Sequence, residues 1–103
     1  MSMPASDLIL RLSEKDVQQR IIDRAKALGW LVYHTHDSRH SAAGFPDLVL
    51  ARRGRTLFVE VKAEKGRLSE AQKEWWVELR LNVTNEVYVW RPSDLGEIED
   101  LLA

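Results

Sequence analysis

Residues 45–62 read FPDLVLARRGRTLFVEVK, and this stretch decides the fold of the chain. It holds two apolar runs of strand length, 47–51 and 56–61, both rich in β-forming residues. Gly54 lies between them and permits a tight turn, so the two runs predict a β-hairpin. The start of the first strand then lies beside the end of the second. Asp47 and Glu60 are therefore expected to be neighbours in space.

Two amphipathic helices flank this hairpin in the sequence. The first is predicted from about Glu14 to Leu28, with Ser13 as N-cap and Asp16 at the third helical position. The second is predicted over residues 69–81. The expected inward-facing residues are Val17, Ile21, Ala25 and Leu28 in the first helix, and Leu68, Trp75, Trp76 and Leu79 in the second.

Three shorter elements complete the prediction. Strands are expected over residues 31–35 and 86–90, and a short acidic helix over 93–102. Ser93, directly behind Pro92, is the expected cap of that last helix. The order is therefore helix, three strands, helix, strand and a final helix.

Polar side chains interrupt the apolar faces of both long helices. At about 100° per residue, Glu14 and Gln18 fall inside the first stripe or at its edge, and Gln72 lies in the middle of the second. A carboxylate that faces the core needs a partner. The alternatives are that Glu14 is a helix N-terminal charge favoured by the macrodipole, and that Gln72 is a surface amide.

Two carboxylates and a lysine at adjacent strand ends suit phosphodiester hydrolysis. A metal ion held by carboxylates neutralises phosphate charge and makes water nucleophilic at neutral pH. Oxygen ligands favour Mg²⁺ or Mn²⁺ over zinc. Lys62 lies two residues after Glu60, so both side chains project from one face of a strand. The alternative is that Asp47, Glu60 and Lys62 form an ordinary salt-bridge cluster.

These motifs resemble those of the PD-(D/E)XK nuclease superfamily, in particular its small VRR-NUC branch of stand-alone phage and bacterial proteins. The resemblance extends from about Ser13 to Arg91. It implies an α/β fold like that of restriction endonucleases, an αβββαβ core whose mixed sheet is flanked by helices. We expect one domain over residues 1–103, with its core at about 13–91. The motif residues, in order, are Glu14, Pro46-Asp47, Glu60-Val61-Lys62 and Gln72.

The resemblance also implies roles for the motif residues. Asp47 and Glu60 are expected to bind the metal, and the main-chain carbonyl of Val61 to add a ligand. Lys62 is expected to assist the attacking water.

The two helices supply the other expected site residues. Glu14 maps to the glutamate of the family's first helix, and it is expected to be a catalytic residue and a further metal ligand. Gln72 maps to the glutamine of the second helix and is expected to be a catalytic residue. One departure concerns residues 34–36: the family often has an arginine and an asparagine there, whereas this chain has His-Thr-His. A substrate contact made by that arginine is therefore not expected here.

The charge distribution favours a DNA partner. Fifteen basic and sixteen acidic residues give a net charge of −1, but residues 39–73 hold eight basic and four acidic residues. Turns and helix starts carry most of these basic residues, where they can contact backbone phosphates. For Arg52, Arg53 and Arg55, at the far end of the hairpin, a solvated charged turn is the favoured alternative. The expected DNA-contacting residues are His36, Arg39, His40, Lys65 and Arg67.

Several classes of function are excluded or disfavoured by composition. The chain has no cysteine, so disulfide and thiol chemistry are excluded, and His34, His36 and His40 lack a fourth ligand for zinc. His34 is instead expected at the edge of the core. No nucleotide-phosphate loop, signal peptide or membrane-spanning run is found, so no nucleotide cofactor or membrane association is expected. A cytoplasmic location, in a bacterium or phage-infected cell, is expected.

The sequence therefore predicts a Mg²⁺- or Mn²⁺-dependent DNA endonuclease. One small domain has little surface with which to read bases, so structure-selective cleavage of branched DNA, such as a four-way (Holliday) junction, is favoured, with a homodimer presenting two sites. Two alternatives stay open. The chain could cut flaps or single strands as a monomer, or it could bind DNA or protein without turnover.

Overall fold

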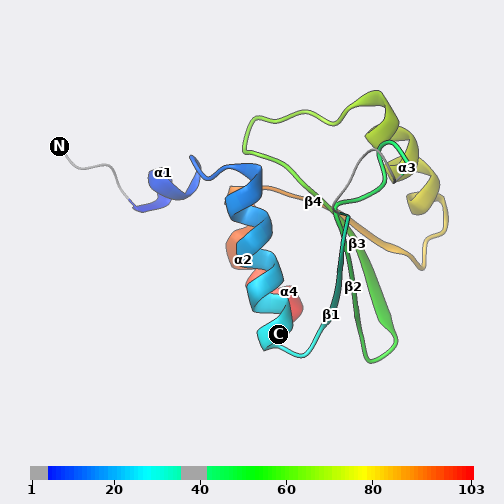
Figure 1. The fold of residues 1–103 in the computed structure, drawn as a ribbon, viewed down its shortest axis with the longest axis horizontal. Helices are drawn as coiled ribbons and strands as arrows, with labels where there is room; N and C mark the ends of the chain where they lie inside the picture. Colours follow the sequence, from blue (N-terminus) through cyan, green and yellow to red (C-terminus); the bar gives the residue numbers. More distant parts are fainter. Residues whose placement is uncertain (1–4, 36–41) are drawn as a thin grey trace.

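The predicted order of helices and strands is confirmed in the computed structural model, which describes residues 5–35 and 42–103 (Figure 1). One helix, α1, was not predicted; it precedes the others and projects from the body of the molecule. The elements are α1 (Ala5–Ile9), α2 (Glu14–Ala27), β1 (Leu31–His34), β2 (Leu48–Arg52), β3 (Arg55–Val61), α3 (Glu70–Leu81), β4 (Glu86–Trp90), a 3₁₀ turn (Pro92–Asp94) and α4 (Leu95–Leu102).

The predicted hairpin is formed by β2 and β3. Its strands pair antiparallel from Leu48 opposite Val59 to Arg52 opposite Arg55. Both residues of the connecting turn, Arg53 and Gly54, have positive φ angles, 51° and 82°. Two successive positive φ angles characterise the type I′ turn, whose twist matches that of the flanking strands.

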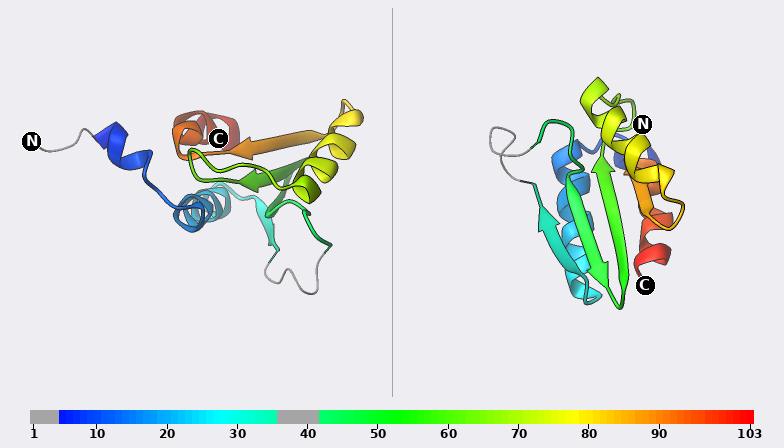
Figure 2. Two further views of the ribbon diagram at one scale, coloured as in Figure 1. Left: turned by 90° about the horizontal axis from the view of Figure 1, so that it is seen from above. Right: turned by 90° about the vertical axis from the view of Figure 1, so that its right-hand side faces the viewer.

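The four strands form one mixed sheet in the order β1-β2-β3-β4. β1, β2 and β3 are antiparallel neighbours, whereas β4 pairs parallel with β3 after the crossover through α3. Figure 2 shows α2 and α4 on one face of this sheet and α3 on the other. The fold is therefore the expected α/β architecture with helices on both sides.

The hydrophobic core lies between the sheet and the α2/α4 layer. Alternate residues of β2 and β3 point into it, as the period of a strand requires. The indole of Trp30 closes one end and donates a hydrogen bond over 2.9 Å to the carbonyl of Leu102. Fully buried members are Val17, Ile21, Ala25, Leu48, Leu50, Leu57, Val59, Val61 and Leu102.

The structure corrects two details of the predicted helices. α3 has no fully buried residue, and its expected inward-facing side chains are only half-buried, because α3 covers the sheet face outside the core. α4 begins at Leu95, and Ser93 does not cap it: Ser93 lies in the 3₁₀ turn, where its N–H donates to Glu64 Oε2.

Within the described ranges, no helix is long and apolar enough to cross a membrane.

Candidate active site

Asp47 and Glu60 meet at one end of the hairpin, as predicted. The register places Leu48 opposite Val59, so one step further it places Asp47 opposite Glu60. Asp47 Oδ2 accepts a hydrogen bond of 2.9 Å from the backbone N–H of Val61. Glu60 is only 6% exposed. A buried carboxyl and a half-buried one therefore lie together at this end of the sheet.

Burial raises the pKa of the Glu60 carboxyl to about 8, assisted by its hydrogen bond with the Asp47 side chain and by the charge of Asp47. The charge of Lys62 acts in the opposite direction but does not cancel these effects. Two neighbouring carboxyl groups that resist full ionisation would be stabilised in their charged forms by a bound cation. Its donors are all oxygen, which fits a hard divalent ion such as Mg²⁺ or Mn²⁺.

The structure describes two carboxylates at this point rather than a larger cluster. Over residues 5–35 and 42–103, no group of three or more His, Cys, Asp or Glu side chains lies close enough to hold a metal ion. Mg²⁺ is commonly bound by one or two carboxylates, with water and substrate phosphate completing its coordination. Asp47 and Glu60 therefore fit this mode of binding.

Lys62 follows β3 directly and is 8% exposed. Its Nζ lies 3.8 Å from Oε1 of Glu14, at the N-terminus of α2. Glu14 lies at the edge of the apolar stripe of α2 and not within it, since half of its side chain is exposed. The partner that a carboxylate at this position needs is therefore Lys62.

Gln72 connects α3 to the carboxylate pair. Its Nε2 donates a hydrogen bond of 2.9 Å to Glu60 Oε1, while its Oε1 accepts one of 2.8 Å from the N–H of Ser69. Ser69 Oγ in turn accepts from the N–H of Gln72, which completes a capping box. The alternative of a surface amide is wrong, because one side chain caps the helix and contacts the site.

Gly44 sets how closely α3 approaches the site, a role that the sequence did not reveal. A Cβ at this position would lie 2.3 Å from the carbonyl carbon of Ala71 and 2.6 Å from the backbone N of Gln72. Its φ of +84° also disfavours any other residue. The sequence does place Gly44 directly before the motif segment 45–47. It gives no indication that Gly44 contacts α3.

Arg91 is a second residue that sequence reasoning missed. Its Nη1 donates to the carbonyls of Ala63, Glu64 and Gly66, at 2.8, 3.2 and 2.6 Å. These carbonyls belong to the turn after Lys62. A Cβ on Gly66 would lie 3.5 Å from Glu14 Oε1, so Arg91 holds this turn against the start of α2.

The predicted DNA-contacting residues divide into two groups. Lys65 and Arg67 are exposed in the loop between β3 and α3. His36, Arg39 and His40 lie outside the described residues.

The hairpin arginines Arg52 and Arg55 have structural partners. The Arg52 guanidinium stacks 4.5 Å from the Trp30 ring centre and donates to the carbonyls of Leu28 and Ala103. Arg55 makes a bidentate ion pair with Glu86, at 2.7 and 2.8 Å. Arg53 is exposed at the turn. For Arg52 and Arg55, a structural role is therefore favoured over phosphate contact.

His34 is half-buried at the end of β1, which agrees with its expected place at the edge of the core. Its Nε2 contacts Nε2 of Gln18, which lies one helical turn after Glu14. Gln18 thus links α2 to β1.

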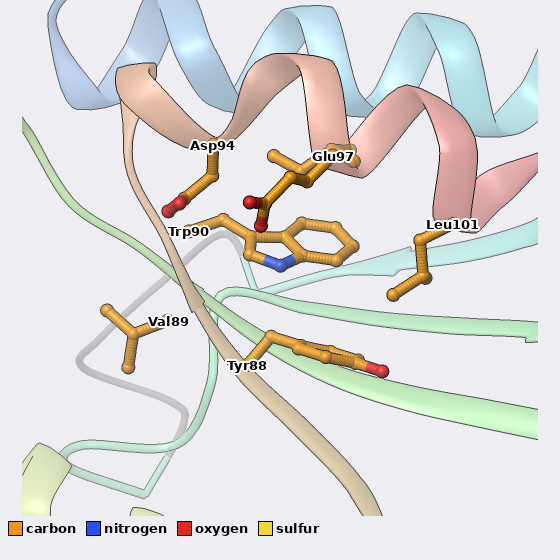
Figure 3. Close-up of a pocket in the computed structure, with 7 residues that line it drawn as sticks. Tyr88, Val89, Trp90, Asp94, Glu97 and Leu101 are labelled. Atoms are coloured by element: carbon orange, nitrogen blue, oxygen red, sulfur yellow. The ribbon is translucent and has the colours of Figure 1, made fainter.

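A separate cavity of about 190 Å³ lies between β4 and α4. Figure 3 shows the rings of Tyr88 and Trp90 beneath the carboxylates of Asp94 and Glu97. Val61 pairs with Trp90 and Glu60 with Val89, so Trp90 points to the sheet face opposite Glu60. Acidic side chains disfavour phosphate, and this cavity is therefore not the candidate active site.

The fold and the carboxylate-lysine site define a nuclease domain of the PD-(D/E)XK type. The family model of the VRR-NUC domain matches residues 5–89, so the chain belongs to the VRR-NUC domain family. This match covers the whole span from Glu14 to Gln72, and the predicted family is confirmed. Divalent metals are in general use in this superfamily.

Comparisons with individual proteins agree. The chain is similar to a solved structure of a VRR_NUC domain, with 30% identity and a TM-score of 0.66, over 86% of this chain and 92% of the other. A VRR_NUC domain protein shares the fold with a TM-score of 0.65 at 22% identity, over 89% and 91% of the two chains. The Fanconi-associated nuclease 1 homolog of Schizosaccharomyces pombe is 42% identical over 57 residues. These residues are 53% of this chain but only 8% of that relative.

Proposed function

We propose that this chain hydrolyses DNA phosphodiester bonds as a Mg²⁺- or Mn²⁺-dependent endonuclease. The observation that carries the proposal is the buried carboxyl of Glu60 beside the half-buried Asp47, with the buried Lys62 nearby. A salt-bridge cluster alone does not account for it, because the ion pair of Lys62 is with Glu14, while Glu60 is buried beside a second carboxylate. The similarity to a Fanconi-associated nuclease homolog supports the same class of reaction.

The side chains divide the work as follows. Asp47 and Glu60 hold the cation, with the Val61 carbonyl as a further ligand. A divalent ion bound there supplies charge neutralisation on the phosphate and lowers the pKa of the attacking water. Lys62 donates hydrogen bonds from its ammonium to that water or to a phosphate oxygen.

The helices keep this arrangement in place. Glu14 orients Lys62 through their ion pair at 3.8 Å. The structure does not group Glu14 with Asp47 and Glu60 as a third carboxylate ligand, so its expected role as a metal ligand is not part of this proposal. Gln72 orients the Glu60 carboxylate through its amide.

We further propose that the substrate is branched DNA, such as a four-way junction, and that two copies of the chain act together. Lys65 and Arg67 are exposed in the loop between β3 and α3, where they can contact phosphates without reading bases. Leu31, 76% exposed on the edge strand β1, supports association of two copies. A symmetric dimer would offer one site to each of two strands.

The test is cleavage of a labelled four-way junction and a linear duplex of the same sequence, in Mg²⁺ or Mn²⁺. Wild type is compared with Lys62→Ala and with Lys73→Ala, a control lysine that is exposed on α3 and pairs with Glu70. Circular dichroism establishes that both variants are folded. We expect junction cleavage to fall by at least about 100-fold in Lys62→Ala and to persist in Lys73→Ala.

Other outcomes decide between the rival functions. Cleavage of flaps or single strands by a species with the mass of one chain would replace the junction proposal with the monomeric alternative. Binding of DNA without cutting in either metal would reject the enzyme in favour of a binding module.

A further inference from the structure

A groove of about 560 Å³ runs between the segment that joins α1 to α2 and the turn after β3. Leu10 and Leu12 form one side, and Ala63 contributes to the other. Leu10 is 41% exposed although it is a large apolar residue. The volume lies within the usual range for small-molecule pockets, about 300–1,000 Å³.

The walls of the groove adjoin two residues of the candidate active site. On one wall, Ser13 directly precedes Glu14; on the other, Ala63 directly follows Lys62. The ion pair between Glu14 and Lys62 joins the two walls at their inner end. Figure 1 shows the start of α2 beside the chain that leaves β3, with α1 extending beyond them.

The charges along the groove are balanced. Arg11 and Lys65 contribute two cations, and Asp7 and Glu64 two carboxylates. The Glu64 carboxylate already accepts a hydrogen bond of 3.0 Å from the N–H of Ser93. A neutral groove with an apolar side suits the flat face of a nucleobase, while the two cations remain available to its flanking phosphates.

We propose that this groove accepts one unpaired nucleotide of the DNA substrate, next to the phosphate in the candidate active site. Its base packs against Leu10 and Leu12, and its phosphates face Arg11 and Lys65. The proposal rests on the proposed function and deepens it. A base in a continuous duplex is stacked and paired, so a nucleotide at a flap or in a mismatch enters at a lower free-energy cost of unstacking. Selection of DNA structure thus needs no reading of bases.

The test uses a flap substrate that carries the fluorescent base 2-aminopurine as the first unpaired nucleotide at the branch, bound by the full chain in Ca²⁺. The variant is Leu10→Ser. Leu8→Ser is the matched control, because Leu8 is 54% exposed on α1 and does not line the groove. Gel analysis afterwards establishes that the DNA is intact.

We expect the fluorescence of the unpaired base to change on binding to wild type and Leu8→Ser. Leu10→Ser should abolish this change and bind the unpaired substrate about tenfold more weakly, the effect expected when one buried leucine side chain is removed. Affinity for plain duplex should be equal in all three. Equal behaviour of Leu10→Ser and Leu8→Ser on the unpaired substrate would overturn the groove, as would an unchanged signal with wild type.

Cleavage assays distinguish failure of the groove proposal from failure of the proposed nuclease function. Cutting of the flap substrate by wild type and by Leu10→Ser with the same KM would reject the groove and leave the nuclease intact. A wild type that cuts nothing, yet shows the Leu10-dependent fluorescence change, would reject the nuclease and retain the groove.

Discussion

The amide of Gln72 donates a hydrogen bond of 2.9 Å to Oε1 of Glu60, across the gap between α3 and β3. The same amide accepts from the N–H of Ser69 at the start of α3. A glutamine is therefore needed for two opposite tasks, as a donor to the site and an acceptor for the helix. Glutamate could perform only the second.

Gln72→Glu separates the two tasks. Glutamate at this position retains the capping box, so thermal stability should stay near that of wild type. Cleavage at pH 7 should fall by roughly 100-fold, as when one aligned donor is removed. Gln72→Ala is the control, since it removes the donor without adding charge and also destabilises the helix. Full activity of Gln72→Glu at pH 7 would rule out the donor role.

Cation binding should strengthen as pH rises. The pKa of Glu60 is raised from 4.5 to about 8, so below pH 8 a cation must displace a proton. The apparent affinity for Mn²⁺ should increase by up to about tenfold per pH unit from about pH 6 to 8, and should level off above that. Calorimetric titration of wild type and Glu60→Gln at each pH measures this. An affinity that does not vary with pH in wild type would contradict it.

Without metal, the stability of the folded chain should decrease as pH rises, whereas cation binding strengthens. Between pH 4.5 and about 8 the folded chain retains a proton on Glu60 that the unfolded chain releases. The free energy of unfolding should therefore decrease as pH rises through this window. Urea unfolding in EDTA measures the slope, and Glu60→Gln should flatten it. A slope unchanged by Glu60→Gln would assign the effect to other groups.

Gly44→Ala should disrupt the packing of α3 against the site. Its Cβ would lie 2.3 Å from the backbone of Ala71, which cannot move without shifting Gln72. Gly29→Ala is the matched control, because its φ of +86° is similar and no atom lies within 4 Å of the added Cβ. Gly29→Ala should cost about 1–2 kcal/mol in urea unfolding, and Gly44→Ala at least about twice as much. Equal destabilisation would show that backbone strain alone operates at Gly44.

Substitutions of the basic residues should fall into two groups, those that weaken DNA binding and those that lower stability. Lys65→Gln and Arg67→Gln should each weaken DNA binding and reduce the salt slope by about one, because each removes a cation that neutralises one phosphate, with stability unchanged. Arg52→Gln should instead lower stability, since its guanidinium joins Trp30 to two carbonyls. Binding at several salt concentrations, paired with urea unfolding, measures both. Equal DNA affinity in Lys65→Gln, Arg67→Gln and wild type would exclude this loop from the interface.

Local patterns were sufficient to predict much of the fold and the meeting of the motif residues. The hairpin was predictable because Gly54 and the two apolar runs act over a few residues, and its register brings Asp47 to Glu60. The contact of Gln72 with Glu60 was not predicted, since it depends on where α3 lies over the sheet. Neither the contact of Gly44 with α3 nor the clamp by Arg91 could be predicted, because each joins residues that are remote in sequence.

The sequence by itself determined the order of helices and strands, the pairing in the hairpin and the residue types that meet at its end. These follow from side-chain periodicity, turn chemistry and helix capping, all of which act over short stretches of chain. The raised pKa of Glu60 and the support that Arg52 gives to the fold depend on the tertiary structure. Desolvation and long-range hydrogen bonds depend on distances in space, which no local pattern contains.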